Sequence, residues 1–160
     1  MSAPAVVDSA IVPGSDDEVP RLAAAFENGT LPQAAWTHRA HLLVALWYSS
    51  RLEPEEALAA MRYGILRLNG VHGVETTPTR GYHETITRAY MRLVRGFVAS
   101  EGSREPWARR AAKLMERHGE RDHLLRYYSR ERLMSQEARF GWVEPDVGRL
   151  PGVTLSPRSV

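Results

Sequence analysis

The stretch that decides the fold runs from Thr37 to Ser50 and reads THRAHLLVALWYSS. Its segment from Leu42 to Tyr48 is apolar nearly all round, which is typical of a helix buried at the centre of a domain. Thr37 stands just before this stretch and is a residue that commonly caps a helix N-terminus. We therefore expect a central helix from His38 to about Ser50.

Further stretches with helix start and stop signals surround this one. Each of these stretches begins near acidic residues or a proline, as is usual at helix N-termini. Some of them are followed by Asn-Gly or Gly, as is usual at helix C-termini. The expected helices cover residues 16–28, 54–69, 83–100, 106–118 and 121–128, followed by a short turn that Ser129 caps. No strand alternation is convincing, so the sequence predicts an all-α, single-domain bundle of about five to six helices.

The chain of 160 residues suffices for one domain with a sizeable core. We expect a flexible N-terminal tail over 1–15, the helical domain over 16–152 and a C-terminal tail over 153–160. Residues 139–160 read as irregular, with Phe140 and Trp142 as anchors. No apolar run approaches the length of a membrane span, and the N-terminus has no basic region before its apolar residues. These features predict a cytoplasmic protein without a membrane partner.

Four of the six histidines fall between Trp36 and Glu84. His38 and His41 are three residues apart, so their rings leave the same face of the expected helix. His83 lies one turn before Ile86 on the inward stripe of another helix. Since the chain has no cysteine, only His, Asp and Glu remain as ligands. The sequence predicts that His38, His41 and His83 hold a divalent transition metal (Zn, Fe, Mn or Ni) where two helix N-termini meet.

Residues near these histidines are candidates for further roles. Glu84 lies about 100° round the helix from His83, which makes it an awkward second ligand and a better acid–base group. Tyr82 and Thr87 are predicted to join Glu84 in catalysis. The candidate substrate-binding residues are Trp36, Asn69, His72 and Arg80.

Several functions fit these residues. Three imidazoles and a water would form a zinc-like site for hydrolysis, hydration (lyase) chemistry or isomerisation of a small polar molecule, whereas two imidazoles with Glu84 would resemble a non-haem iron oxygenase. The alternative is a non-catalytic helical protein that binds a small ligand or a partner in a metal-free polar pocket. Residues 104–132 hold nine basic and five acidic residues, and this interleaving argues against nucleic acid. A homo-oligomer is compatible with the sequence.

Three more residues read as structural. His118 and His123 are expected to be hydrogen-bonded core histidines. Asp146 follows Trp142 in the tail and either closes over a site or, more commonly for such a segment, lies on the bundle.

The motifs WTHRAH (36–41), NGVHG (69–73), GYHETIT (81–87) and YSRERLMSQEARFGWVEPD (128–146) also carry a resemblance. Over about residues 20–152 the chain resembles a family of small bacterial proteins with WTHxxH, NxxHG and GYHETxT motifs, to which we attach no activity. The resemblance implies a single domain and marks His38, His41, His83 and Glu84 as motif positions.

Overall fold

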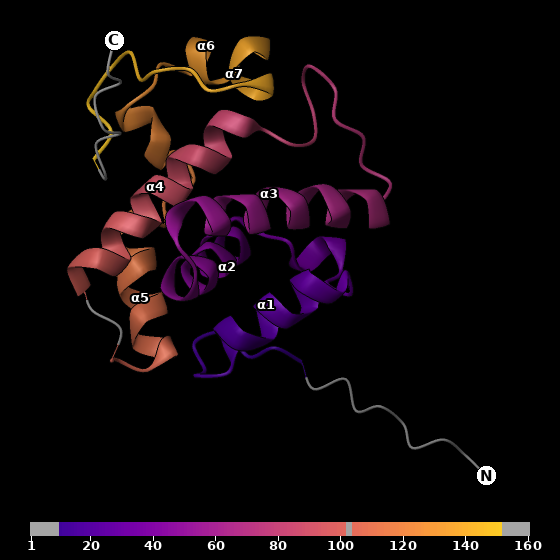
Figure 1. The fold of residues 1–160 in the computed structure, drawn as a ribbon, viewed down its shortest axis with the longest axis vertical. Coiled ribbons are helices and arrows are strands. Elements are labelled where there is room, and N and C mark those ends of the chain that lie inside the picture. Colours follow the sequence, from indigo (N-terminus) through magenta and orange to yellow (C-terminus); the bar gives the residue numbers. More distant parts are fainter. Residues whose placement is uncertain (1–9, 102–103, 152–160) are drawn as a thin grey trace.

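The computed structural model describes residues 10–101 and 104–151. Within these ranges it contains α-helices and two short 3-10 turns but no strand, which confirms the all-α prediction (Figure 1). The elements are α1 (Glu18–Asn28), η1 (Gln33–Ala35), α2 (His38–Arg51), α3 (Pro54–Val71), α4 (Glu84–Glu101), α5 (Trp107–His118), η2 (His123–Arg126), α6 (Arg130–Leu133) and α7 (Gln136–Phe140).

Helix α2 is the central element, as its sequence predicts. The Thr37 side chain accepts a hydrogen bond from the backbone N–H of Ala40 at 3.1 Å, so the expected N-cap is formed. Helices α1, α3, α4 and α5 all pack against α2, which explains why it has no polar face.

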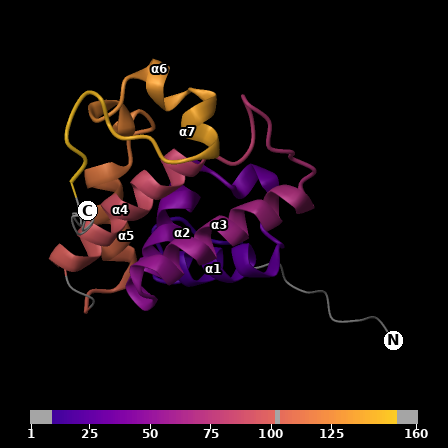
Figure 2. The same cartoon turned by 45° about the horizontal axis from the view of Figure 1, so that its top comes forward.

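Helix α4 separates two apolar clusters. Met91, Val94 and Phe97 belong to the main core around α2. Ala89 and Leu93 belong to a second cluster, which is completed by residues of the C-terminal third of the chain. The C-terminal helices α6 and α7 therefore lie over the beginning of α4, at one end of the molecule (Figure 2).

Two predicted elements differ in the structure. Helix α4 begins at Glu84, so His83 precedes the helix instead of opening it. The predicted helix over 121–128 is wrong, because only the 3-10 turn η2 forms there. Gly119 ends α5 and the side chain of Ser129 caps α6, as predicted. The few residues between them leave little room for a stable α-helix.

Of the two predicted anchors of the C-terminal segment, only Trp142 packs against the bundle. Phe140 ends α7 and is 56% exposed, because Ala138 and Arg139 occupy the buried side of that short helix. Trp142 packs partly against the second cluster, whereas Val143 and Leu150 are buried in it. Asp146 accepts hydrogen bonds from the backbone N–H and hydroxyl of Ser129, which holds the segment on the bundle.

The predicted tails fall largely outside the described residues. Residues 1–9 and 153–160 lie outside the described residues. In the described part of the predicted N-terminal tail, the backbone N–H of Gly14 donates to the Glu18 carboxylate at 2.9 Å. Among the described helices, none is long and apolar enough to cross a membrane.

Candidate functional site

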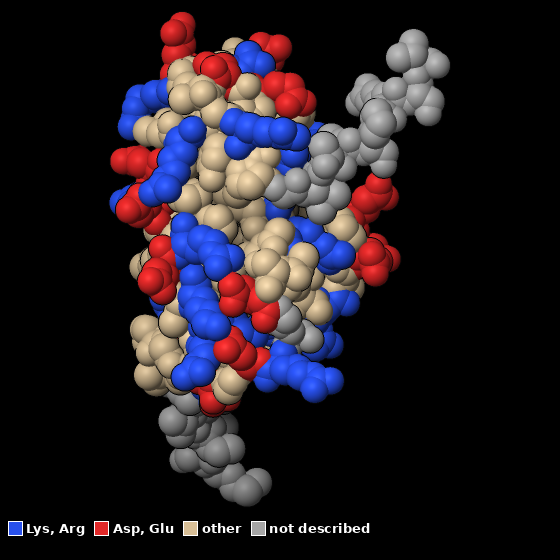
Figure 3. All heavy atoms as spheres, turned by 90° about the vertical axis from the view of Figure 1, so that its left-hand side faces the viewer, with Lys and Arg blue, Asp and Glu red and all other residues tan. Residues whose placement is uncertain are grey.

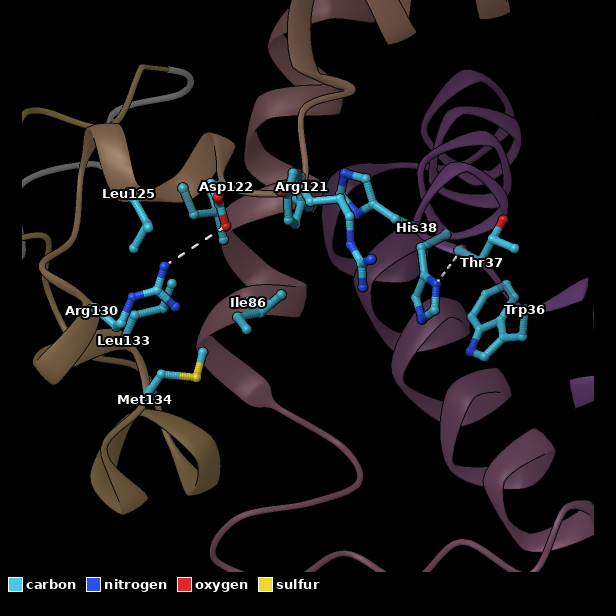
Figure 4. Close-up of a pocket in the computed structure, with 13 residues that line it drawn as sticks. Trp36, Thr37, His38, Ile86, Arg121, Asp122, Leu125, Arg130, Leu133 and Met134 are labelled. Atoms are coloured by element: carbon cyan, nitrogen blue, oxygen red, sulfur yellow. Dashed lines mark hydrogen bonds and ion pairs between the residues drawn. The ribbon is translucent and has the colours of Figure 1, made fainter. Parts of the chain in front are cut away.

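A cavity of about 460 Å³ lies between the N-terminus of α2, the first half of α4 and the segment from η2 to α6 (Figure 4). We call it the histidine pocket. It is lined by Trp36, Thr37, His38, His41, Ile86, Tyr90, Arg121, Asp122, Leu124, Leu125, Arg130, Leu133 and Met134. A smaller cavity of about 50 Å³ adjoins it and shares both histidines, Ile86 and Tyr90, with Thr87 as an additional wall.

The His41 ring is fixed by its neighbours. Its Nδ1 lies 2.7 Å from the backbone carbonyl oxygen of Thr37, so Nδ1 carries the hydrogen and Nε2 is left as an acceptor. The ring lies against that of Trp36, with 3.7 Å between the ring centroids and a tilt of 31° between the ring planes. Burial lowers the pKa of His41 to about 4, so the ring is neutral at pH 7.

The His38 ring has an unused nitrogen. Its Nε2 atom is buried and has no hydrogen-bond partner in the described part of the chain, and the same is true of the Tyr90 hydroxyl. The two rings meet edge to face, with 5.4 Å between their centroids. Burial, with a contribution from the charge of Arg121, lowers the pKa of His38, although a hydrogen bond to the backbone of Glu120 works to raise it. Since buried polar atoms without a partner are rare and cost free energy, these two atoms indicate a place for a ligand's polar groups.

The rim of the pocket carries charge, and its walls are apolar. Arg121, Asp122 and Arg130 are exposed, and a weak ion pair of 4.0 Å joins Arg130 to Asp122. The rim therefore has one more positive than negative charge. Ile86 and four apolar residues of the C-terminal side form the walls. Figure 4 shows Leu125, Leu133 and Met134 across the cavity from Trp36 and His38.

His83 does not join the other two histidines as a free ligand. Its Nε2 lies 2.7 Å from the backbone carbonyl oxygen of Leu133, and its Nδ1 accepts the backbone N–H of Ile86 at 3.1 Å. Both nitrogens are therefore used, one to cap α4 and one to bind the C-terminal segment. Within 10–101 and 104–151, no group of three or more His, Asp or Glu residues is placed to hold a metal ion. This geometry does not assemble the predicted set of His38, His41 and His83.

The predicted catalytic residues form a network beside the pocket. Glu84 accepts two hydrogen bonds from Arg62, at 2.9 and 2.7 Å, and a third from the Tyr82 hydroxyl at 2.6 Å. Burial works to raise the pKa of Glu84, but the bonds from Arg62 and Tyr82 together bring it below its ordinary value. The Thr87 hydroxyl donates to the backbone carbonyl of His83 at 2.9 Å. Glu84 is thus an ionised, fully engaged carboxylate that links α3 to α4, and only Thr87 borders the adjoining cavity.

The predicted substrate-binding residues are divided. Trp36 lines the histidine pocket, whereas Asn69, His72 and Arg80 do not. The His72 Nε2 atom lies 2.9 Å from the backbone carbonyl oxygen of Leu31. Arg80 is exposed in the loop before α4, where its backbone pairs with Thr77.

Sequence reasoning missed several residues of the pocket. Tyr90 reads as plain core, and no pattern separates Arg121, Asp122 and Arg130 from other surface charges. The structural reading of His118 and His123 is confirmed, because both are buried and a 2.9 Å hydrogen bond joins His118 Nδ1 to His123 Nε2.

Comparison of the chain with models of protein families, with curated proteins and with solved structures finds no match.

Proposed function

We propose that this protein binds a small polar organic acid in the histidine pocket, with His38 and His41 as neutral hydrogen-bond acceptors. The observation that carries the proposal is a pair of buried atoms, His38 Nε2 and Tyr90 Oη, that have no hydrogen-bond partner within 10–101 and 104–151 and lie at a cavity of about 460 Å³. This proposal develops the metal-free binding alternative predicted from the sequence.

The chemistry of the lining limits the ligand. Neutral His38 and His41 offer acceptor nitrogens, so a ligand that satisfies them brings an N–H or O–H donor. Arg121 and Arg130 at the rim favour a negatively charged group, with which arginine forms strong, charge-assisted hydrogen bonds. Trp36 and the aliphatic walls suit an apolar or aromatic part of a few atoms. A hydroxy or amino acid with a compact apolar frame meets all three requirements.

Matched ligands test each requirement separately. The first set of ligands consists of 4-hydroxybenzoate, benzoate, which lacks the hydroxyl donor, and 4-hydroxybenzamide, which lacks the charge. A second set consists of a hydroxy acid, the acid without the hydroxyl and the hydroxy amide, all with an aliphatic frame in place of the ring. Calorimetric titration should show the tightest binding for the hydroxy acid of at least one frame. The ligand without the hydroxyl and the ligand without the charge should each bind about tenfold more weakly than the hydroxy acid, because each loses about one good hydrogen bond.

The variant His38→Phe keeps an aromatic ring but removes the acceptor. His72→Phe is the matched control, because His72 lies outside the pocket. Weaker binding in His38→Phe alone, with both variants folded by circular dichroism, supports the proposal. Equal binding by all three proteins, or no binding of either hydroxy acid, refutes it.

The metal-dependent enzyme remains a second candidate, because His38 and His41 do face one cavity from the same side of α2. Metal analysis of protein purified without a histidine tag tests it. Stoichiometric metal that disappears in His38→Ala would favour the enzyme. Because both nitrogens of His83 are engaged, His83→Ala should leave the metal content unchanged.

A further inference from the structure

A second groove, of about 270 Å³, lies between the beginning of α3, the middle of α4 and Trp142. We call it the arginine groove. It is lined by Ser49, Pro54, Glu55, Ala57, Leu58, Arg88, Met91, Arg92, Arg95 and Trp142, none of which lines the histidine pocket. The side of the molecule that carries α4 and α5 shows a band of basic side chains with acids among them (Figure 3).

Three arginines dominate one side of the groove. Arg88, Arg92 and Arg95 follow each other at spacings of four and three, which places them on one face of α4. All three are half-buried, yet none forms an ion pair with a carboxylate in the part of the chain that the structure describes. Half-buried positive charges of this kind favour a negatively charged partner.

The contacts that these arginines do make are weak or apolar. The Arg88 guanidinium lies over the Trp142 ring, 5.0 Å from its centroid. Arg95 reaches the backbone carbonyls of Ser49 and Leu52 only at 3.4 Å. The Nε atom of Arg92 is buried and has no hydrogen-bond partner among the described residues.

Ser49 supplies a second, independent indication. Its side chain lines the groove and the residue is only 3% exposed, but its hydroxyl has no hydrogen-bond partner in the described ranges. Most serines in a helix have their hydroxyl bonded to a backbone carbonyl or to water. A buried serine hydroxyl beside arginines is suited to an anion's oxygen atoms.

The rest of the groove is apolar. Ala57 and Met91 are buried, and Leu58 and Trp142 are half-buried beside them. Glu55 lies on the rim and is exposed. An anion bound by the arginines would thus have an apolar surface directly next to it.

We propose that the arginine groove binds a small amphiphilic anion. Its carboxylate or phosphate monoester group pairs with Arg88, Arg92, Arg95 and the Ser49 hydroxyl. Its short aliphatic chain packs against Leu58, Met91 and Trp142. This site is independent of the histidine pocket, so either can fail without the other.

Calorimetric titration of the full chain with octanoate and octyl phosphate, both as monomers, tests the site. We expect one molecule bound per chain. Octan-1-ol and inorganic phosphate should each bind at least about tenfold more weakly, because each lacks one half of the ligand.

Variants locate the binding. Arg92→Gln and Ser49→Ala should weaken octanoate binding, the arginine change by about tenfold. Arg109→Gln is the control, because it removes the same charge from an exposed position of α5. His38→Phe should leave octanoate binding unchanged. An equal loss in Arg92→Gln and Arg109→Gln, several molecules bound per chain, or no binding by the wild type overturns the proposal.

Vesicles identify the source of the anion. Binding to phosphatidic acid vesicles, whose lipid carries a phosphate monoester, that requires Arg92 and is absent with phosphatidylcholine would support the site with a membrane lipid as its ligand. Binding of octanoate or octyl phosphate without vesicle binding would support it with a free amphiphile.

Discussion

The hydrogen-bond partners of each imidazole decide what that imidazole can do in this protein. His41 lines the pocket, donates through Nδ1 and keeps Nε2 as an acceptor. His83 uses one nitrogen to cap α4 and the other to bind the carbonyl of Leu133. His38 has a buried nitrogen without a partner in the described part of the chain. His38 and His41 therefore differ in role from His83, although all three belong to the predicted motifs.

His83→Ala should lower the free energy of unfolding by about 2–4 kcal/mol. The substitution removes the cap of Ile86 and leaves the Leu133 carbonyl without its donor. Urea unfolding measures the loss. His83→Asn can still cap α4, so it should lose less; a loss below about 0.5 kcal/mol for His83→Ala would contradict this role.

For single residues, the sequence predicts the direction of a side chain better than its hydrogen-bond partners. The helical spacing correctly brings His38 and His41 to one cavity. The engagement of His83 depends on a helix boundary one residue later than predicted, and boundaries are the least certain part of such a prediction. The pairing of Glu84 with Arg62, 22 residues away, depends on how α3 and α4 pack.

A column of rings runs from α1 to α2 and ends at the pocket, and α3 packs against its first ring. Phe26 stacks on Trp36 with 5.0 Å between ring centroids, and Trp36 contacts His41 with their ring planes tilted by 31°. Phe26 also lies against Gly64 of α3, where an added Cβ atom would come within 2.1 Å of its ring. The packing of α3 on α1 therefore fixes one wall of the histidine pocket.

Gly64→Ala should destabilise the protein by about 1–3 kcal/mol, because the methyl group forces Phe26 to move. Gly70→Ala in the same helix meets nothing within 4 Å and should be neutral or stabilise by up to about 1 kcal/mol. Thermal unfolding of both variants measures the difference. Equal stability of the two would show that the close contact is unimportant.

Thr85 attaches the C-terminal segment to α4. Its buried hydroxyl donates to the backbone carbonyl of Gly141 at 2.7 Å and accepts the backbone N–H of Val143 at 3.2 Å. Thr85→Val should therefore cost about 2–4 kcal/mol and make residues after Ser135 more sensitive to protease. Thr79→Val, at an exposed loop position, is the control. Proteolysis that is equally fast in both variants would contradict the attachment.

The long helices are predictable because each has its own start or stop signal and a stripe or run of apolar residues. The short elements η2 and α7 are not, since their few residues gain stability mainly from the second apolar cluster. That cluster is assembled from segments that are distant in the sequence, and the C-terminal wall of the histidine pocket is assembled in the same way. Neither can therefore be predicted from local sequence patterns.

The whole molecule should be less stable in mild acid. Five histidines have lowered pKa values, mainly through burial; they are His38, His41, His83, His118 and His123. In the unfolded chain they titrate near 6.5, so unfolding takes up protons between that pH and the lower folded values, which reach about 4 for His41 and His118. Their contribution is complete above pH 6.5 and is lost as the pH falls.

Urea unfolding between pH 7.5 and 5 tests this sign. The free energy of unfolding should decrease toward pH 5, with a slope that corresponds to more than one proton taken up per molecule. The lowered pKa values of Glu18 and Glu84 act only near and below their ordinary value of 4.5, so they do not explain a change in this range. A flat profile, or greater stability at pH 5, would contradict the burial of neutral imidazoles.

We propose that His38 and His41 face a ligand pocket as neutral acceptors while His83 is a structural cap. Nuclear magnetic resonance of the imidazole nitrogens at pH 7, before and after adding a bound hydroxy acid, tests it most directly. We predict an Nδ1–H tautomer for His41, an Nε2–H tautomer for His83, and ligand-induced shifts at His38 and His41 that leave His83 unchanged. Charged His38 or His41, or shifts confined to His83, would contradict the account.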